Sequence, residues 1–163
     1  MQPLESFITH TKPGPIQPQL SPLKLVLRWH GIKTLQAPKG FRMIPQADLY
    51  IDARGIAEKG IAGTTGLDSS FQEGVKKASA KSLDAILTYI VDGLRHVTAR
   101  RSHLKDPFSE PYTIYFMCAH GVHRSVASAN IIYERLKAMG YDVTIDGGST
   151  SKLNGWMPNG TKE

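Results

Sequence analysis

The sequence predicts an α/β fold: a single domain with a layered, parallel or mostly parallel sheet flanked by helices. Two observations support this prediction. Segments with strand composition alternate with segments of helical periodicity, and strands separated by helices pair in parallel. In addition, polar, charged and glycine residues follow the predicted strands, at the edge where parallel sheets bind their ligands.

Four segments are predicted to be strands, because β-forming residues are concentrated in them and turn-forming residues follow them. They are residues 23–29, 47–51, 112–117 and 142–146. The first ends at His30-Gly31, and the last runs into Gly147-Gly148. We therefore expect the segments that follow these strands to emerge at one edge of the sheet.

Residues 82–101 show the clearest helical pattern, with apolar residues at the spacing i, i+3, i+4, i+7. These residues are Leu83, Ile86, Leu87, Ile90, Val91, Leu94 and Val97. Arg100 and Arg101 lie at the negative end of the helix dipole. A second helix is predicted over residues 125–139, ending at Gly140. Glycines mark a turn-rich loop before the first helix: Gly60, Gly63 and Gly66.

The chain has 163 residues, the size of one ordinary domain. Five of its ten prolines fall in residues 1–22, which predicts a proline-rich, disordered arm. The alternative for this arm is a peptide that docks on a partner. Residues 23–150 are predicted to form the α/β domain and residues 151–163 a C-terminal tail.

Composition limits the function classes. The net charge of +6 favours anionic partners such as phosphates, nucleic acids or acidic membranes. No apolar stretch is long enough to span a bilayer, and the N-terminus lacks the features of a secretory signal. A single cysteine cannot form an internal disulfide. We expect a cytoplasmic protein without a membrane partner.

The most informative motif joins the third strand to the second helix. It consists of Cys118, Ala119, His120, Gly121, Val122, His123, Arg124 and Ser125, here called the Cys118 loop. A loop between a strand and a helix can surround an oxyanion with N–H groups, above the positive end of the helix dipole. Gly121 permits close backbone approach, and Arg124 can form two parallel hydrogen bonds to a phosphate. The motif therefore predicts a phosphate-binding site.

Residues after two other predicted strands can complete this site. Gly31 and Lys33 follow the first strand, and Asp52 and Arg54 follow the second. Lys33 and Arg54 either contact the same anion or are solvated surface charges. Asp52 has three alternatives: it accepts hydrogen bonds from ligand hydroxyls, acts as a general acid, or holds Arg54.

The sequence also allows two further interpretations. Cys118, His120 and His123 are metal-ligand types, but no fourth ligand is evident elsewhere, so neither a metal nor a cofactor is expected. A run of basic residues along and after the long helix is compatible with RNA binding, although no aromatic residues are interspersed. These residues are Lys76, Lys77, Lys81, Arg95, Arg100, Arg101 and Lys105.

The Cys118 loop is similar to the signature His-Cys-x5-Arg-Ser/Thr of the cysteine-dependent phosphatases. Cys118, Arg124 and Ser125 match it, but Met117 replaces the histidine. That resemblance implies Cys118 as nucleophile, Arg124 as phosphoryl ligand and Asp52 as the general acid. No aspartate lies in a recognisable acid loop, so a phosphatase is the alternative interpretation.

A longer resemblance covers residues 25–143. Its motifs are Gly31-Ile32-Lys33, the segment Ala-Asp-Leu-Tyr-Ile-Asp-Ala-Arg at 47–54, Thr65-Gly66-Leu67-Asp68, and Cys118 with Gly-Val-His-Arg-Ser-Val at 121–126. In these motifs the sequence resembles the C-terminal domain of the RapZ family of RNase adapters. The Gly-x4-Gly-Lys-Ser/Thr motif of the kinase-like domain in front is not found, so the resemblance implies a stand-alone C-terminal domain.

The RapZ resemblance implies a sensor or adapter that binds a phosphorylated small molecule, with RNA or a ribonuclease as a further partner. The Cys118 loop would hold the phosphate, and Lys33, Asp52 and Arg54 the rest of a phosphosugar or nucleotide. The sequence departs from the family at Gly60, which stands about where a ligand-contacting histidine falls. The identity of the ligand and the formation of a homo-oligomer both stay open.

Overall fold

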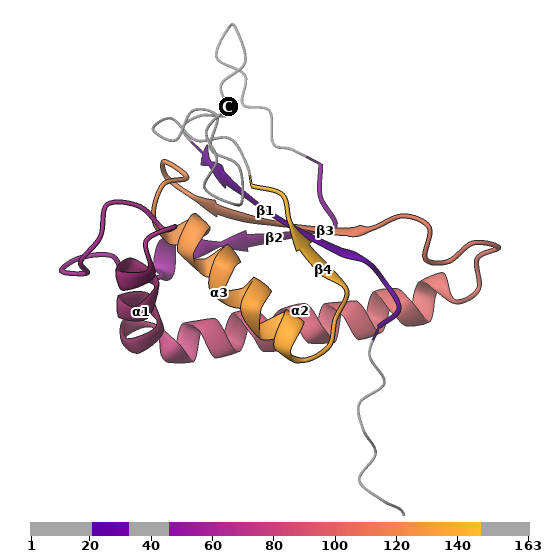
Figure 1. Cartoon of the computed structure of the whole chain (residues 1–163). Helices are drawn as coiled ribbons and strands as arrows, with labels where there is room; N and C mark the ends of the chain where they lie inside the picture. Colours follow the sequence, from indigo (N-terminus) through magenta and orange to yellow (C-terminus); the bar gives the residue numbers. More distant parts are fainter. Residues whose placement is uncertain (1–20, 33–45, 148–163) are drawn as a thin grey trace, which may run out of the picture.

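The computed structural model describes residues 21–32 and 46–147 (Figure 1). Its elements are β1 (Leu25–Gly31), β2 (Leu49–Asp52), the 3-10 turn η2 (Ala53–Gly55), α1 (Ser69–Ala78), α2 (Ala80–Arg101), β3 (Tyr112–Cys118), α3 (Arg124–Ala138) and β4 (Val143–Ile145). Lys33, the tail at 151–163 and nearly all of the arm at 1–22 lie outside the described residues.

The strands form one sheet with the order β2-β3-β1-β4, and every pair of neighbours is parallel. This confirms the predicted α/β class with a parallel sheet flanked by helices. Gly31 pairs with Cys118 at the ends of β1 and β3, and Asp52 pairs with Met117 at the end of β2. The register therefore brings three of the predicted site segments to one edge of the sheet.

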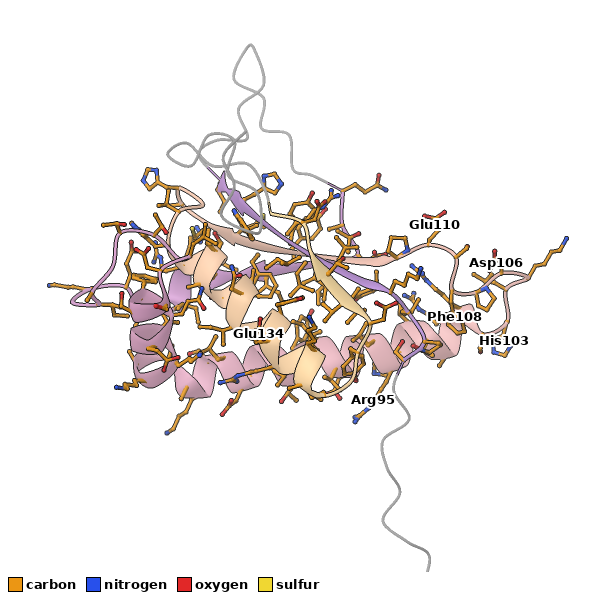
Figure 2. The ribbon with its side chains drawn as sticks, in the orientation of Figure 1. Arg95, His103, Asp106, Phe108, Glu110 and Glu134 are labelled. Carbon is orange, nitrogen blue, oxygen red and sulfur yellow. The ribbon has the colours of Figure 1, made fainter. Side chains whose placement is uncertain are left out.

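The hydrophobic core lies between one face of the sheet and the helices. Alternate residues of β1, namely Leu25, Leu27 and Trp29, are almost fully buried, and β3 contributes Ile114 and Phe116 to the same cluster. In Figure 1 the helices α1, α2 and α3 all lie on this side of the strands. Figure 2 shows side chains filling the space between the two layers. The core thus fixes the sheet edge relative to the start of α3.

The helices differ from the sequence prediction at one place. The predicted helices at 82–101 and 125–139 correspond to α2 and α3, whereas α1 was not predicted. Its signal is short: Asp68 lies at the N-cap position, and only Phe71 and Val75 are buried one turn apart. Residues 57–68 contain no helix or strand, in agreement with the glycine-rich loop.

No helix within the described ranges is both long enough and apolar enough to cross a lipid bilayer.

Candidate functional site

The end of β1 and the Cys118 loop are packed backbone against backbone. A Cβ atom on Gly31 would lie 2.3 Å from the carbonyl carbon of His120. Gly121 has φ +67°, and a Cβ atom there would lie 2.4 Å from the nitrogen of Gly31. Both positions therefore require glycine, and the contact holds the middle of the loop against the sheet edge.

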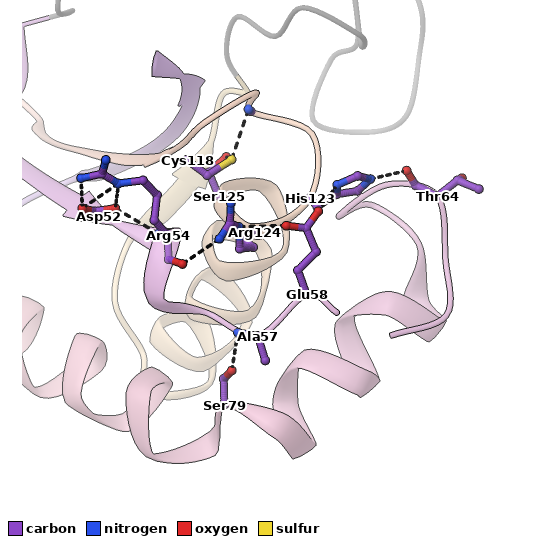
Figure 3. A network of polar contacts seen from close by, with 11 residues as sticks. Asp52, Arg54, Ala57, Glu58, Thr64, Ser79, Cys118, His123, Arg124 and Ser125 are labelled. Carbon is purple, nitrogen blue, oxygen red and sulfur yellow. Dashed lines mark hydrogen bonds and ion pairs between the residues drawn. The ribbon is translucent and has the colours of Figure 1, made fainter. Parts of the chain in front are cut away.

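The thiol of Cys118 lies at the base of this loop (Figure 3). Its Sγ is 3.1 Å from the hydroxyl oxygen of Ser125, and it accepts a hydrogen bond of 3.1 Å from the N–H of Gly121. Cys118 is 3% exposed and Ser125 is fully buried. These contacts close the loop onto the first turn of α3, so the thiol has a clear architectural role.

Arg124 is the first residue of α3, and its guanidinium spans from the loop to the segment after β2 (Figure 3). Nη1 donates a hydrogen bond of 2.7 Å to the carbonyl oxygen of Arg54. Nε lies 3.1 Å from Oε2 of Glu58. The guanidinium thus links the start of α3 to the backbone of Arg54 and to the carboxylate of Glu58.

The ring of His123 lies between two oxygen acceptors. Nε2 is 2.7 Å from the carbonyl oxygen of Thr64, and Nδ1 is 2.5 Å from Oε1 of Glu58. These two contacts fix the orientation of the ring at the start of α3.

The backbone of the first turn of α3 adds further donors. The first hydrogen bond of the helix runs from the N–H of Ala127 to the carbonyl oxygen of His123. By helix geometry, the N–H groups of Arg124, Ser125 and Val126 have no carbonyl partner inside the helix. Together with the helix dipole, they make this end of α3 favourable for an anion.

The donors surround a hollow of about 30 Å³. It is lined by Glu58, Cys118, His120, Val122, His123 and Arg124. Within the loop, Ala119 is half-buried and His120 is exposed, while Gly121 and Val122 are buried. Five of the eight residues of the Cys118 loop therefore line one small space.

Asp52 holds Arg54, which is one of the three alternatives that the sequence left open. Nε of Arg54 lies 2.9 and 3.0 Å from the two carboxylate oxygens of Asp52, and Nη2 lies 2.6 Å from one of them. These hydrogen bonds from the Arg54 side chain lower the pKa of Asp52. A carboxyl group with a lowered pKa is ionised at neutral pH, which disfavours its use as a general acid.

Comparison with protein families matches the RapZ C-terminal domain over residues 39–148. The chain belongs to the RapZ C-terminal domain family. This confirms the resemblance over the matched residues, whereas β1 and Gly31 precede them. Comparison with curated proteins gives no match. Family membership indicates an adapter or binding domain.

In this RapZ C-terminal domain, the motif at 65–68 supports the Cys118 loop from the side. A Cβ atom on Gly66 would lie 2.2 Å from the carbonyl oxygen of His123, and the N–H of Gly66 donates to the carbonyl oxygen of Val122 at 2.8 Å. Oδ2 of Asp68 accepts hydrogen bonds from the N–H groups of Thr64 and Thr65 at 2.6 and 2.9 Å. The motif thus fixes Thr64, whose carbonyl oxygen contacts the ring of His123.

Glu58 is the site residue that the sequence did not reveal. It lies in the glycine-rich loop of the RapZ C-terminal domain and contacts both His123 and Arg124. Its own sequence neighbourhood is that of an ordinary surface glutamate, four residues after Arg54. No cluster of three or more metal-ligating residues occurs among the residues that the structure describes.

Proposed function

We propose that this RapZ C-terminal domain is a sensor or adapter that binds a phosphorylated small molecule, a phosphosugar or nucleotide, on the Cys118 loop. One observation supports this most strongly: the side chains of His123 and Arg124, at the start of α3, line one hollow together with Cys118 at the end of β3. The hollow already attracts an anion of the chain itself, the carboxylate of Glu58. Donors that hold a carboxylate suit a phosphate equally well.

The size of the hollow indicates which part of the ligand it can hold. With Glu58 in place the hollow is about 30 Å³, which leaves no room for a sugar or a base. The remainder of the ligand then lies outside it, toward Arg54 and Asp52 at the end of β2. We expect Arg54 to be the second contact, because its guanidinium is largely exposed although paired.

The proposal is tested with inorganic phosphate and an Arg124→Ala variant. Phosphate is expected to raise the melting temperature of the unmodified protein and to leave that of Arg124→Ala unchanged. The matched control is Arg135→Ala. Arg135 lies near the end of α3, and its side chain pairs with Asp84 of α2. An equal rise in the Arg124→Ala variant would contradict the proposal.

A cysteine-dependent phosphatase is the rival proposal, and turnover of an aryl phosphate separates the two. The burial of Cys118 and the lowered pKa of Asp52 favour a binding domain. We expect no turnover beyond that of a Cys118→Ser variant. Cysteine-dependent turnover of about 1 per second or more would establish an enzyme instead.

RNA binding is a second candidate function, supported by exposed cations on α1 and α2. Lys77, Lys81 and Arg100 are exposed, and Arg95 extends from α2 away from the sheet (Figure 2). Two cations of the basic run are neutralised, since Lys76 pairs with Glu73 and Arg95 pairs with Asp92. RNA affinity is expected to fall steeply with salt and with Lys81→Glu/Arg100→Glu. Affinity that is independent of both changes would contradict this candidate.

A further inference from the structure

We propose that Glu58 is a specificity-determining residue of the Cys118 loop: its carboxylate is an internal anion that the ligand phosphate must replace. The inference rests on the proposed function, because it concerns the same loop. It goes further, because it identifies what competes with the ligand. It also predicts which anions displace the carboxylate of Glu58 and bind.

The position of Glu58 is fixed by its neighbours in the chain. Ile56 is 3% exposed and packs in the smaller core cluster, under α1 and α3. The N–H of Ala57 donates a hydrogen bond of 2.9 Å to the hydroxyl oxygen of Ser79, between α1 and α2 (Figure 3). With two preceding residues anchored in this way, the carboxylate of Glu58 is held at the mouth of the Cys118 loop.

The carboxylate uses both oxygens on donors that a phosphate needs. Oε1 contacts Nδ1 of His123 at 2.5 Å, and Oε2 contacts Nε of Arg124 at 3.1 Å. Nη1 of Arg124 is engaged by the carbonyl oxygen of Arg54. A guanidinium binds a phosphate through two parallel N–H groups. With Glu58 in place, one of these groups on Arg124, at Nε, already faces a carboxylate oxygen.

The space beside Glu58 is too small for both anions. About 30 Å³ accommodates roughly two water molecules, whereas a phosphoryl group brings three terminal oxygens and the phosphorus. The side chain of Glu58 is 37% exposed, so it can leave the hollow toward solvent. Binding is therefore an exchange, in which the phosphate enters as the carboxylate leaves.

Charge decides which ligand succeeds in this exchange. A phosphate monoester carries close to two negative charges at neutral pH, and its oxygens form shorter and stronger bonds to Arg124 than a single carboxylate does. A free carboxylate such as acetate has no such advantage, and it competes against a tethered group of high effective concentration. Displacement of Glu58 weakens every anion by the same factor, so only an anion that binds as strongly as a phosphate is held measurably.

The experiment titrates inorganic phosphate and, separately, acetate into the full chain and into Glu58→Gln. Glu73→Gln is the matched control, because Glu73 pairs only with the exposed Lys76 on α1. Glu58→Gln is expected to bind phosphate roughly tenfold more tightly, the change of one charge-assisted contact, and to bind acetate measurably for the first time. The control is expected to bind both as the unmodified protein does.

Weaker phosphate binding by Glu58→Gln would overturn the inference, because Glu58 would then position the donors. Unchanged phosphate and acetate binding would overturn it as well. Glu58→Ala provides a second variant with the same expected gain if the amide side chain disturbs folding. Failure of the proposed function has a different signature: Arg124→Ala would then bind phosphate as tightly as the unmodified protein.

Discussion

Gly31 and Gly121 lie so close that neither has room for a Cβ atom. A methyl group on Gly31 would meet the carbonyl group of His120 at 2.3–2.4 Å, and one on Gly121 would meet the Gly31 nitrogen at 2.4 Å. The contact joins the end of β1 to the Cys118 loop through main-chain atoms that cannot move aside as a side chain does. The shape of the Cys118 loop therefore depends on two glycines that bring no functional group to it.

Gly31→Ala is expected to destabilise the fold, because the clash is with backbone. Overpacking of this kind costs about 1–3 kcal/mol of unfolding free energy, and more where nothing can relax. The control is Gly55→Ala, where a Cβ atom meets nothing within 4 Å. Urea denaturation is the measurement, and equal stability of the two variants would contradict the close contact.

Gly66→Ala is expected to separate the 64–68 segment from the start of α3. Its Cβ atom would lie 2.2 Å from the carbonyl oxygen of His123 and 2.5 Å from the nitrogen of Ala127. Thr64 would then withdraw from the His123 ring, so phosphate binding falls together with melting temperature. Gly93→Ala on α2 is the control, since its nearest contact is an ordinary 3.6 Å and alanine favours a helix. A Gly66→Ala variant with normal phosphate affinity would disprove the link.

His30 is expected to make the fold less stable in acid. Burial, with a smaller effect of the Arg28 charge, lowers the pKa of His30 to about 4. The unfolded chain, with a pKa near 6.5, then binds the proton more readily than the folded one. Stability is therefore fully present above about pH 6.5 and is lost as the pH falls toward 4, by an amount of order 3 kcal/mol.

The measurement for His30 is urea denaturation at pH 7 and at pH 4.5, with His30→Gln as the variant that cannot titrate. The difference in stability between the two pH values is expected to be smaller in the variant. Identical pH dependence in both proteins would show that His30 takes up its proton equally well when folded.

Cys118→Ser is expected to keep phosphate binding within about threefold, because a hydroxyl can accept from Gly121 and bond to Ser125 as the thiol does. Calorimetric titration with inorganic phosphate measures this. Ser125→Ala, which removes the other partner, is the informative comparison. Complete loss of binding in Cys118→Ser with an intact fold would indicate that the sulfur itself contacts the anion.

Much of the fold and the site followed from local patterns. The long helix was predictable because seven apolar residues repeat along one side of it. The Cys118 loop was predictable because its residue types are rare in combination and stand between a strand and a helix. Helix α1 was missed, because its buried side consists of two large residues after a run of glycines. Short helices of this kind depend on tertiary packing.

The carboxyl-end edge of the sheet and the Cys118 loop between a strand and a helix are properties that local sequence already specifies. They depend on strand direction and backbone conformation, which a few neighbouring residues control. The pairing of Asp52 with Arg54 and the reach of Glu58 to His123 and Arg124 are of another kind. Asp52 had three possible roles, and Glu58 looked like any surface glutamate. The position of Glu58 depends on Ile56, which packs under α1 and α3, and on Ala57, which bonds to Ser79, so only the assembled fold places its carboxylate at the loop.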